Sequence, residues 1–217
     1  VDSFSVSTQE DNPTGVTFNN DGTKMFVSGN TGNDVGEYSL TTAFDVSTAT
    51  FVGRFEVVNQ DNNPSDVAFN NDGTKMFVTG FSGDDVNEYT LSTGFDLTST
   101  VTFVNPNGNG TGFDISGQDR VPEDIVFNND GTRMFVVGAT GRDVNEYTLS
   151  VGFDLTSTVT FVDSFDISGQ DTNPRSMTFN NTGTKMFVVS NVDNEINSYT
   201  LFCPFAVTNS SKCEEPP

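Results

Sequence analysis

The hydrophobic positions of this chain recur in a long repeat. The ten residues FNNDGTKMFV begin at Phe18, and they return, identical or with one change, at Phe69, Phe127 and Phe179. These starts are spaced by 51, 58 and 52 residues, and the four tyrosines of the chain keep the same three spacings. A repeat of this length is typical of folds that stack one supersecondary unit several times.

Within one unit the pattern predicts four short strands. In the second unit these are PSDVAF (Pro64–Phe69), TKMFVTG, DVNEYTL (Asp85–Leu91) and a stretch that contains TVTFV. The NNDG between the first two strands supplies residues that tolerate the positive φ of a tight hairpin turn. Met76, Phe77 and Val78 are consecutive and apolar, which predicts that both faces of the second strand are buried.

Four antiparallel strands per unit are typical of a β-propeller blade, so we predict an all-β, four-bladed β-propeller. VDSFSVSTQE at Val1 aligns with VDSFDISGQD at Val162, which predicts that Val1–Val6 is a fourth strand. We expect it to pair with the third strand of the last blade, around 195–201, and to close that blade and its open edge. The alternatives are a fragment of a larger ring and two chains that share an eight-bladed ring.

The C-terminal end differs from the repeat and contains both cysteines. Cys203 and Cys213 lie ten residues apart, which predicts a disulfide and an oxidising, extracellular compartment; two free thiols are the alternative. We therefore predict a propeller domain over residues 1–202 and a tail over 203–217. The chain begins with Val and shows no signal peptide, which favours a processed or trimmed chain.

The hairpin sequence resembles that of known propellers. A strand, NNDGT and a second strand KMFV resemble the PDG hairpin repeats of TolB-type (PD40) and YVTN/lactonase-like propellers, and the resemblance covers all four units. It departs at Asn20, Asn71, Asn129 and Asn181, where those families usually have proline. The resemblance implies the fold. It implies function only weakly, because propellers carry many chemistries.

The charge balance limits the partners. The net charge is −21 and there is no histidine. Such a surface repels nucleic acid and anionic membranes, and no run approaches the roughly 18 apolar residues of a membrane span. Solubility is the simplest interpretation of the charge, and divalent cations or cationic partners are the alternative.

Repeated carboxylates are the candidate metal ligands. The linkers before each first strand carry Glu10, Asp61, Asp119 and Asp171, and the turns after each second strand carry Asp34, Asp85, Asp143 and Glu195. If these gather at one rim, the first four predict a calcium site. The alternative, which we favour, is that each carboxylate caps backbone N–H groups in its own turn.

Residues that differ between repeats are the candidate ligand-binding positions, because the scaffold does not dictate them. They open the innermost strands or stand at a turn tip, where we expect Phe81 to be exposed: Thr14, Ser65, Asp66, Phe81, Glu123, Asp124 and Arg175. Neutral drift in loops is the alternative.

Three functions compete. No His or Cys stands beside a serine to form a nucleophilic triad, so we predict no enzyme. We predict a secreted binding or adhesion module whose partner is a glycan or a cell-surface protein, bound through repeated weak sites. A self-associating subunit of an extracellular assembly is the second hypothesis. The third, a lactonase-like hydrolase, predicts activity that depends on Glu123 or Asp124.

Overall fold

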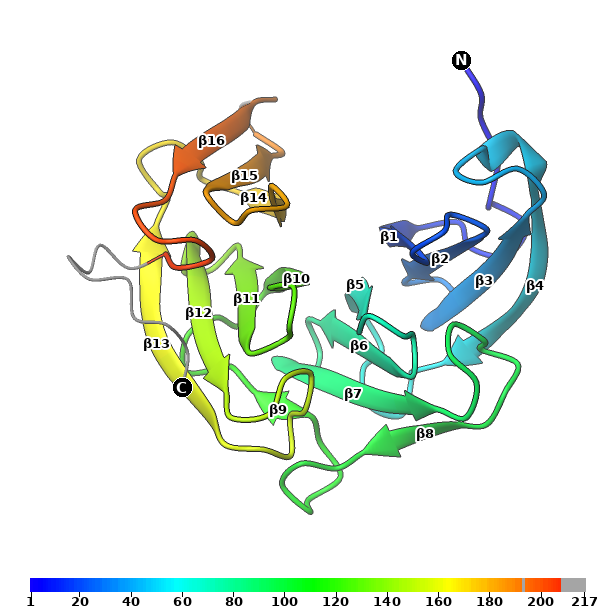
Figure 1. Ribbon diagram of the computed structural model, residues 1–217, viewed down its shortest axis with the longest axis horizontal. Coiled ribbons are helices and arrows are strands. Elements are labelled where there is room, and N and C mark those ends of the chain that lie inside the picture. The colour runs from blue at the N-terminus through cyan, green and yellow to red at the C-terminus, as the bar shows by residue number, and fades with distance from the viewer. Residues whose placement is uncertain (193, 208–217) are drawn as a thin grey trace. The chain divides into compact units, whose positions relative to one another are not determined.

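The strands form four propeller blades, as predicted. The computed structural model describes residues 1–192 and 194–207 (Figure 1). It divides into two compact units, Val1–Asp114 and Ile115–Pro217. The first unit holds two blades. The first blade contains β1 (Pro13–Phe18), β2 (Lys24–Gly29), β3 (Asp34–Leu40), a 3-10 turn (Val46–Thr48) and β4 (Ala49–Glu56); the second contains β5 (Pro64–Phe69), β6 (Lys75–Gly80), β7 (Asp85–Leu91), β8 (Val101–Val104) and β9 (Phe113–Asp114).

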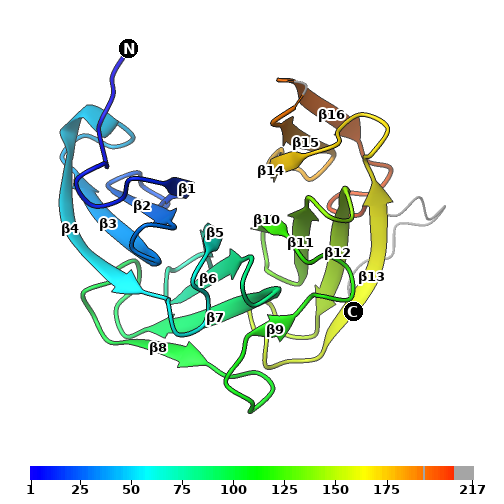
Figure 2. The same ribbon diagram turned by 180° about the vertical axis from the view of Figure 1, so that it is seen from behind.

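The second unit holds the other two blades. The third blade contains β10 (Pro122–Phe127), β11 (Arg133–Gly138), β12 (Asp143–Leu149) and β13 (Val159–Asp166); the fourth contains β14 (Pro174–Phe179), β15 (Lys185–Ser190) and β16 (Ile196–Thr200). Consecutive strands pair antiparallel in every blade, and β9 continues the outer edge of the second blade by pairing with β7. Figure 2 shows the same strand order from behind.

Each inner hairpin turns at the repeated NNDG or NNTG. In the first blade Gly22 has a φ of +71°, and its N–H donates to the carbonyl of Asn19 over 3.1 Å. Asp21 Oδ1 accepts the N–H of Thr23 over 3.0 Å, and the hydroxyl and N–H of Thr23 lower the pKa of the Asp21 carboxyl. The turn residues therefore satisfy one another locally, as the sequence predicted.

A phenylalanine locks each hairpin turn, which the sequence analysis did not foresee. Phe44 has a φ of +59° and donates its N–H to the carbonyl of Gly22 over 2.9 Å. Its ring lies so close that a Cβ at Gly22 would be 2.3 Å from a ring carbon. Phe95, Phe153 and Phe205 repeat this arrangement over Gly73, Gly131 and Gly183. Because positive φ is uncommon for a bulky residue, the ring packing and hydrogen bond must offset that cost.

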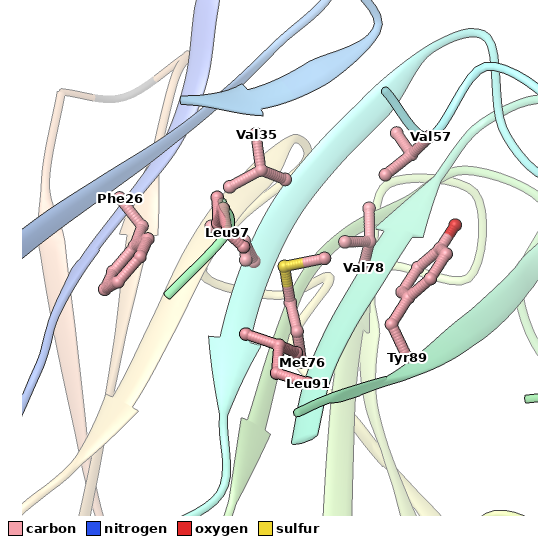
Figure 3. Close-up of a cluster of buried hydrophobic side chains, with 9 residues drawn as sticks. Phe26, Val35, Val57, Met76, Val78, Tyr89, Leu91 and Leu97 are labelled. Carbon is pink, nitrogen blue, oxygen red and sulfur yellow. The ribbon is translucent and has the colours of Figure 1, made fainter. Parts of the chain in front are cut away.

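Within each unit one blade packs on the next through aromatic rings. In the first unit the ring centroid of Phe26 lies 4.5 Å from that of Phe69. Figure 3 shows Phe26 and Val35 of the first blade in one cluster with Met76, Val78 and Tyr89 of the second. In the second unit Phe135 lies 4.7 Å from Phe179 in the same way. The second strand is thus buried on both faces, as predicted for Met76, Phe77 and Val78, each 0% exposed.

The basic and acidic residues that recur in the first three blades pair across neighbouring strands. Lys24 Nζ lies 2.7 Å from Glu37 Oε1, Lys75 Nζ lies 2.8 Å from Glu88 Oε1, and the Arg133 guanidinium contacts the Glu146 carboxylate. The acids also join the blades, because Glu37 Oε2 accepts the N–H of Leu97 over 2.7 Å and Glu146 Oε2 accepts that of Val207 over 2.8 Å. The fourth blade has Asn197 at this position.

The structure differs from the prediction at the ends of the propeller. Val1–Val6 has no strand conformation, and the sheet of the fourth blade has three strands among the described residues. Phe4 instead packs edge-on against Tyr38, with ring centroids 5.6 Å apart. Apolar contact with the first blade therefore holds the segment in place without a strand ladder.

The predicted boundary at residue 202 stays a prediction. Cys203 is 3% exposed and is not a free thiol. Cys213 lies outside the described residues, so its pairing with Cys203 stays a prediction as well.

We expect Phe135→Ala to lower the free energy of unfolding by about 3–5 kcal/mol, because it empties a fully buried ring site between two blades. Phe161→Ala is the matched control, since that ring is 40% exposed on an outer strand and should cost about 1 kcal/mol or less. Urea unfolding of both variants measures the difference. Equal losses of unfolding free energy in the two variants would contradict the claim that packing between blades stabilises the fold more than burial on the outer strands does.

Candidate functional site

The linker carboxylates cap backbone N–H groups. Glu10 Oε1 accepts the N–H groups of Asn12 over 2.6 Å and Thr31 over 3.0 Å, and Oε2 accepts that of Gly32 over 3.1 Å. Asp61 and Asp119 repeat this capping in the second and third blades. These bonds lower the pKa of Glu10, although burial, the largest single effect, raises it. The geometry favours the capping interpretation for these positions.

Glycine makes room for these carboxylates. A Cβ at Gly29 would lie 2.2 Å from the Glu10 side chain, and Gly80 and Gly138 are equally close to Asp61 and Asp119. The fourth repeat has Ser190 there instead, and Ser190 Oγ donates to Asp171 Oδ1 over 2.8 Å. The calcium site predicted from the four linker acids stays a prediction; within residues 1–192 and 194–207 no group of three His, Cys, Asp or Glu side chains is placed to hold a metal ion.

The second set of acids lies beside the first, and Asp85 is the most perturbed. Asp85 is 2% exposed. It accepts a hydrogen bond from Asn87 Nδ2 over 2.7 Å. It accepts another from the N–H of Gly112 over 2.9 Å, in the loop between β8 and β9. Burial raises its pKa to about 6, and the charges of Asp61 and Asp114 add to the rise.

In the first unit two of the predicted ligand-binding residues bind backbone carbonyls. Thr14 Oγ1 donates to the carbonyl of Pro64 over 2.9 Å, and Ser65 Oγ donates to that of Thr79 over 3.1 Å. A Cβ at Gly15 would lie 2.4 Å from Asp66 Oδ1. This cluster therefore joins the first two inner strands closely. Phe81 is half-buried, so the expectation that it is exposed is wrong.

In the second unit the structure brings three predicted residues together. Arg175 opens β14, and its guanidinium NH1 lies 2.7 Å from Glu123 Oε1 on β10. Asp124 Oδ2 accepts the hydroxyl of Ser176 and the N–H of Met177, each over 2.6 Å. Arg175 is 43% exposed and Glu123 is 7% exposed. A buried carboxylate is thus held by an arginine that still reaches solvent.

The environment of Glu123 suits proton transfer. Burial raises the pKa of its carboxyl, Arg175 opposes the rise, and the charges of Asp119 and Asp124 add to it. A carboxylate with a raised pKa is a better general base near neutral pH than an exposed one.

Two further arginines lie in the loops that meet at Asp119, whose charge acts on Glu123, and were missed by the sequence analysis. Arg120 follows Asp119, and Arg142 follows Gly141, whose N–H donates to Asp119 Oδ2 over 2.6 Å. Both arginines are exposed. A comparison of the repeats could have found them, because the positions equivalent to Arg120, Arg142 and Arg175 hold no other arginine or lysine. Of the nine basic residues, four occupy the repeated pairing position, Arg54 bridges Asp34 and Lys212 lies outside the described residues; these three arginines remain.

A sequence model of the family described as "Lactonase, 7-bladed beta-propeller" matches residues 1–203. The chain belongs to this lactonase family. The hairpin resemblance to lactonase-like propellers is therefore confirmed, whereas the prediction of a non-enzymatic binding module is corrected in favour of the lactonase-like hydrolase. The error came from requiring a nucleophilic triad, which hydrolysis of a cyclic ester by water does not need. No curated protein matches the sequence.

Solved structures share the fold of this lactonase-family chain. One is a proposed 6-phosphogluconolactonase from Bacteroides uniformis, with 12% identity, a TM-score of 0.59, and coverage of 92% of this chain and 54% of that one. A periplasmic gluconolactonase from Pseudomonas aeruginosa has 16% identity, a TM-score of 0.52, and coverage of 87% and 49%. A chain of a nidogen–laminin complex has 13% identity and a TM-score of 0.56, with coverage of 87% of this chain and 60% of that one. The chain thus spans about half the length of the structures it resembles.

The sequence predicts no membrane span, and the structure bears on this expectation only through its helices. The part of the chain that the structure describes contains no helix with the length and apolar character needed to cross a membrane.

The raised pKa of Asp85 predicts a pH-dependent stability. A folded-state pKa of about 6, against about 3.9 in an unfolded chain, means that this stabilisation is complete below about pH 4 and is lost as pH rises through about 6. The loss should approach about 3 kcal/mol. Urea unfolding from about pH 4 to 7 should show that loss in the wild type and not in Asp85→Asn. Asp84→Asn removes the same charge one residue away and should keep the slope; equal slopes in both variants would refute the assignment to Asp85.

Proposed function

We propose that this chain carries the hydrolytic site of a lactonase that opens the cyclic ester of a sugar acid. Membership of the lactonase family supports the reaction class. The observation that carries the proposal is the Glu123–Arg175 pair: one buried carboxylate with a raised pKa, held by one partly exposed guanidinium. The family match replaces the prediction of a binding module, and we propose no glycan partner.

The reaction needs one base and one cation. Glu123 takes a proton from a water molecule, whose oxygen attacks the lactone carbonyl carbon. The carbonyl oxygen becomes an oxyanion, and the exposed N–H groups of Arg175 stabilise its charge. The ring C–O bond then breaks, and Glu123 returns the proton to the leaving oxygen. The product is the open hydroxy acid, and Glu123 ends as it began.

Asp124 positions these groups rather than reacting. Its carboxylate accepts from Ser176 and Met177, so it fixes the start of β14 on β10. Arg175 is the residue immediately before Ser176, so this fixes its backbone opposite Glu123. Positioning of this kind is a large part of what a site contributes, because small displacements of reacting groups cost rate.

The arginines favour a substrate with an anionic substituent. Arg120 and Arg142 are exposed in the loops that meet at Asp119, in a chain of net charge −21. In the first three blades, basic side chains pair with carboxylates on the strands: Lys24, Arg54, Lys75 and Arg133. Exposed guanidinium groups bind phosphate and carboxylate in bidentate geometry. The lactone of a 6-phosphosugar acid, the type of substrate named for the Bacteroides uniformis structure, fits this charge.

An extracellular, oxidising location remains part of the proposal. It is supported by the buried, non-free Cys203. A protein partner is the coarser possibility that propellers of this fold share, as in the nidogen–laminin complex.

Glu123→Gln should lower kcat for lactone opening about 100-fold or more, the usual contribution of a general base, with little change in unfolding. Glu195→Gln is the matched control, since Glu195 is exposed in the same unit. In the wild type the rate should fall as pH drops through the raised pKa of Glu123. Release of acid from glucono-δ-lactone and from its 6-phosphate at constant pH measures the rate. Turnover of both equal to that of buffer would remove the proposal.

Arg120→Gln and Arg142→Gln should each raise KM for the 6-phosphorylated lactone about 10-fold, the effect of losing one charge-assisted hydrogen bond. KM for the unphosphorylated lactone should stay unchanged. Arg54→Gln, which removes a guanidinium that bridges Asp34 in the first unit, is the control for net charge. Equal effects on both substrates would reject the anion-binding role while leaving the hydrolysis intact.

A further inference from the structure

The fourth blade has an open outer edge among the described residues. Its sheet ends at β16, whereas β12 of the third blade pairs with β13 and places Val144 opposite Phe165. The residue of β16 that corresponds to Val144 is Ile196. Val144 is 0% exposed and Ile196 is 70% exposed. Among the described residues, the outer edge of β16 is therefore unpaired and the Ile196 side chain is uncovered.

The N-terminal segment has the sequence of an outer strand but pairs with no sheet among the described residues. VDSFSV (Val1–Val6) repeats VDSFDI, which contains most of β13. The ring centroid of Phe4 lies 5.6 Å from that of Tyr38 in the first blade, and the two ring planes make an angle of 76°. In the same way, the ring centroid of Phe165 on β13 lies 5.2 Å from that of Tyr199 in the following blade, with an angle of 79° between the ring planes. Phe4 thus sits where the outer strand of a preceding blade would place it.

The faces of the first and fourth blades also match. Phe135 of the third blade packs on the Phe179–Phe205 pair of the fourth. Its equivalent, Phe187 on β15, is half-buried, and the neighbouring Val189 is 41% exposed. The first blade carries the matching pair, Phe18 and Phe44, with ring centroids 5.6 Å apart. Phe44 is 60% exposed, so both halves of a blade interface stand open.

An open pocket lies on the same face of the first blade. It has a volume of about 450 Å³ and is lined by Phe4, Val16, Met25 and Val46 among others. In the fourth blade, the residues at this position, Phe205 to Val207, receive the third blade through Phe179 and the Glu146 bond to the Val207 N–H. The pocket is thus an unfilled version of an interface that the chain forms elsewhere.

The polar groups agree with the same pairing. Ser164 Oγ on β13 donates to Asn145 Oδ1 on β12 over 2.6 Å. The equivalent residues are Ser3 and Asn197. Asn197 Nδ2 is buried without a hydrogen-bond partner among the described residues. A strand that brings Ser3 opposite Asn197 would let the Ser3 hydroxyl oxygen accept a hydrogen bond from Asn197 Nδ2 and would cover Ile196 at the same time.

We propose that Val1–Val6 of one copy forms the outer strand of the fourth blade of a second copy, and that the second copy returns the same contact. The apolar faces at Phe18 and Phe44 and at Phe187 and Val189 then meet as well. The chain spans 54% of one structure it resembles, so two copies supply the length of one such propeller. Reciprocal pairing leaves neither strand edge open, which closed assemblies of β proteins require.

The test uses two variants of the full chain, each with one cysteine added to the native Cys203 and Cys213. Ser3→Cys and Asn197→Cys are mixed in equal amounts and oxidised. A disulfide-linked species of two chains is expected on a non-reducing gel. Thr50→Cys, on the exposed outer strand of the first blade, replaces Ser3→Cys in the matched control and should give no link. In the Ser3→Cys/Asn197→Cys double variant, thiol loss without an increase in mass would overturn the proposal in favour of closure within one chain.

Solution mass gives an independent measurement. The wild type should have the mass of two chains by light scattering, and Ile196→Asp should raise the dissociation constant at least about 10-fold by placing a charge in the pairing edge. Val52→Asp, at a 44% exposed valine of β4, should leave association unchanged, and circular dichroism checks that both variants fold. A monomer at every concentration, or an open-ended series of sizes, would overturn the proposal.

Discussion

Burial of the second strand on both faces is the constraint from which the rest of this structure follows. β2 and β11 are buried along nearly their whole length because the next blade covers them, whereas β15 alternates between buried and exposed positions. A blade by itself would leave Phe26 or Phe135 in water. Each such ring is worth several kcal/mol when it is buried. Stacking of several copies is therefore a condition for the stability of any one of them, and the near-identity of the four hairpins follows.

The same packing explains part of the acidic charge, which comes from 30 Asp and Glu residues. Eleven carboxylates are buried, and those described in detail accept backbone N–H groups or pair with a cation. Glu37 does both, since it binds Lys24 within its blade and the N–H of Leu97 in the next. A carboxylate buried in this way joins two blades with strong, charge-assisted hydrogen bonds. The net charge of −21 is thus in part a structural property, and by itself indicates no ligand.

The sequence predicts the repeated strands and turns, and it fails where a conformation depends on tertiary packing or where one copy differs. The hairpins and the double burial of Met76 to Val78 could be predicted because four copies share the same pattern. The positive φ of Phe44 could not, since it depends on a ring that packs over Gly22. A comparison of the repeats marks Arg120 and Arg142 as unusual, but the hydrogen bond between their neighbours, Asp119 and Gly141, is what shows that the two loops meet.

A repeated scaffold also leaves room for chemistry at single positions. Thr14, Ser65, Glu123 and Arg175 are equivalent residues, yet only the last two form a charged pair, and that pair needs two neighbouring blades with different residues at one position. Four identical blades would present four like charges there, which repel one another and bind nothing specifically. The asymmetry that makes Glu123 a base and Arg175 its partner is therefore available only where the repeat is broken. The bonds from Asp124 to Ser176 and Met177 hold the two differing blades in place.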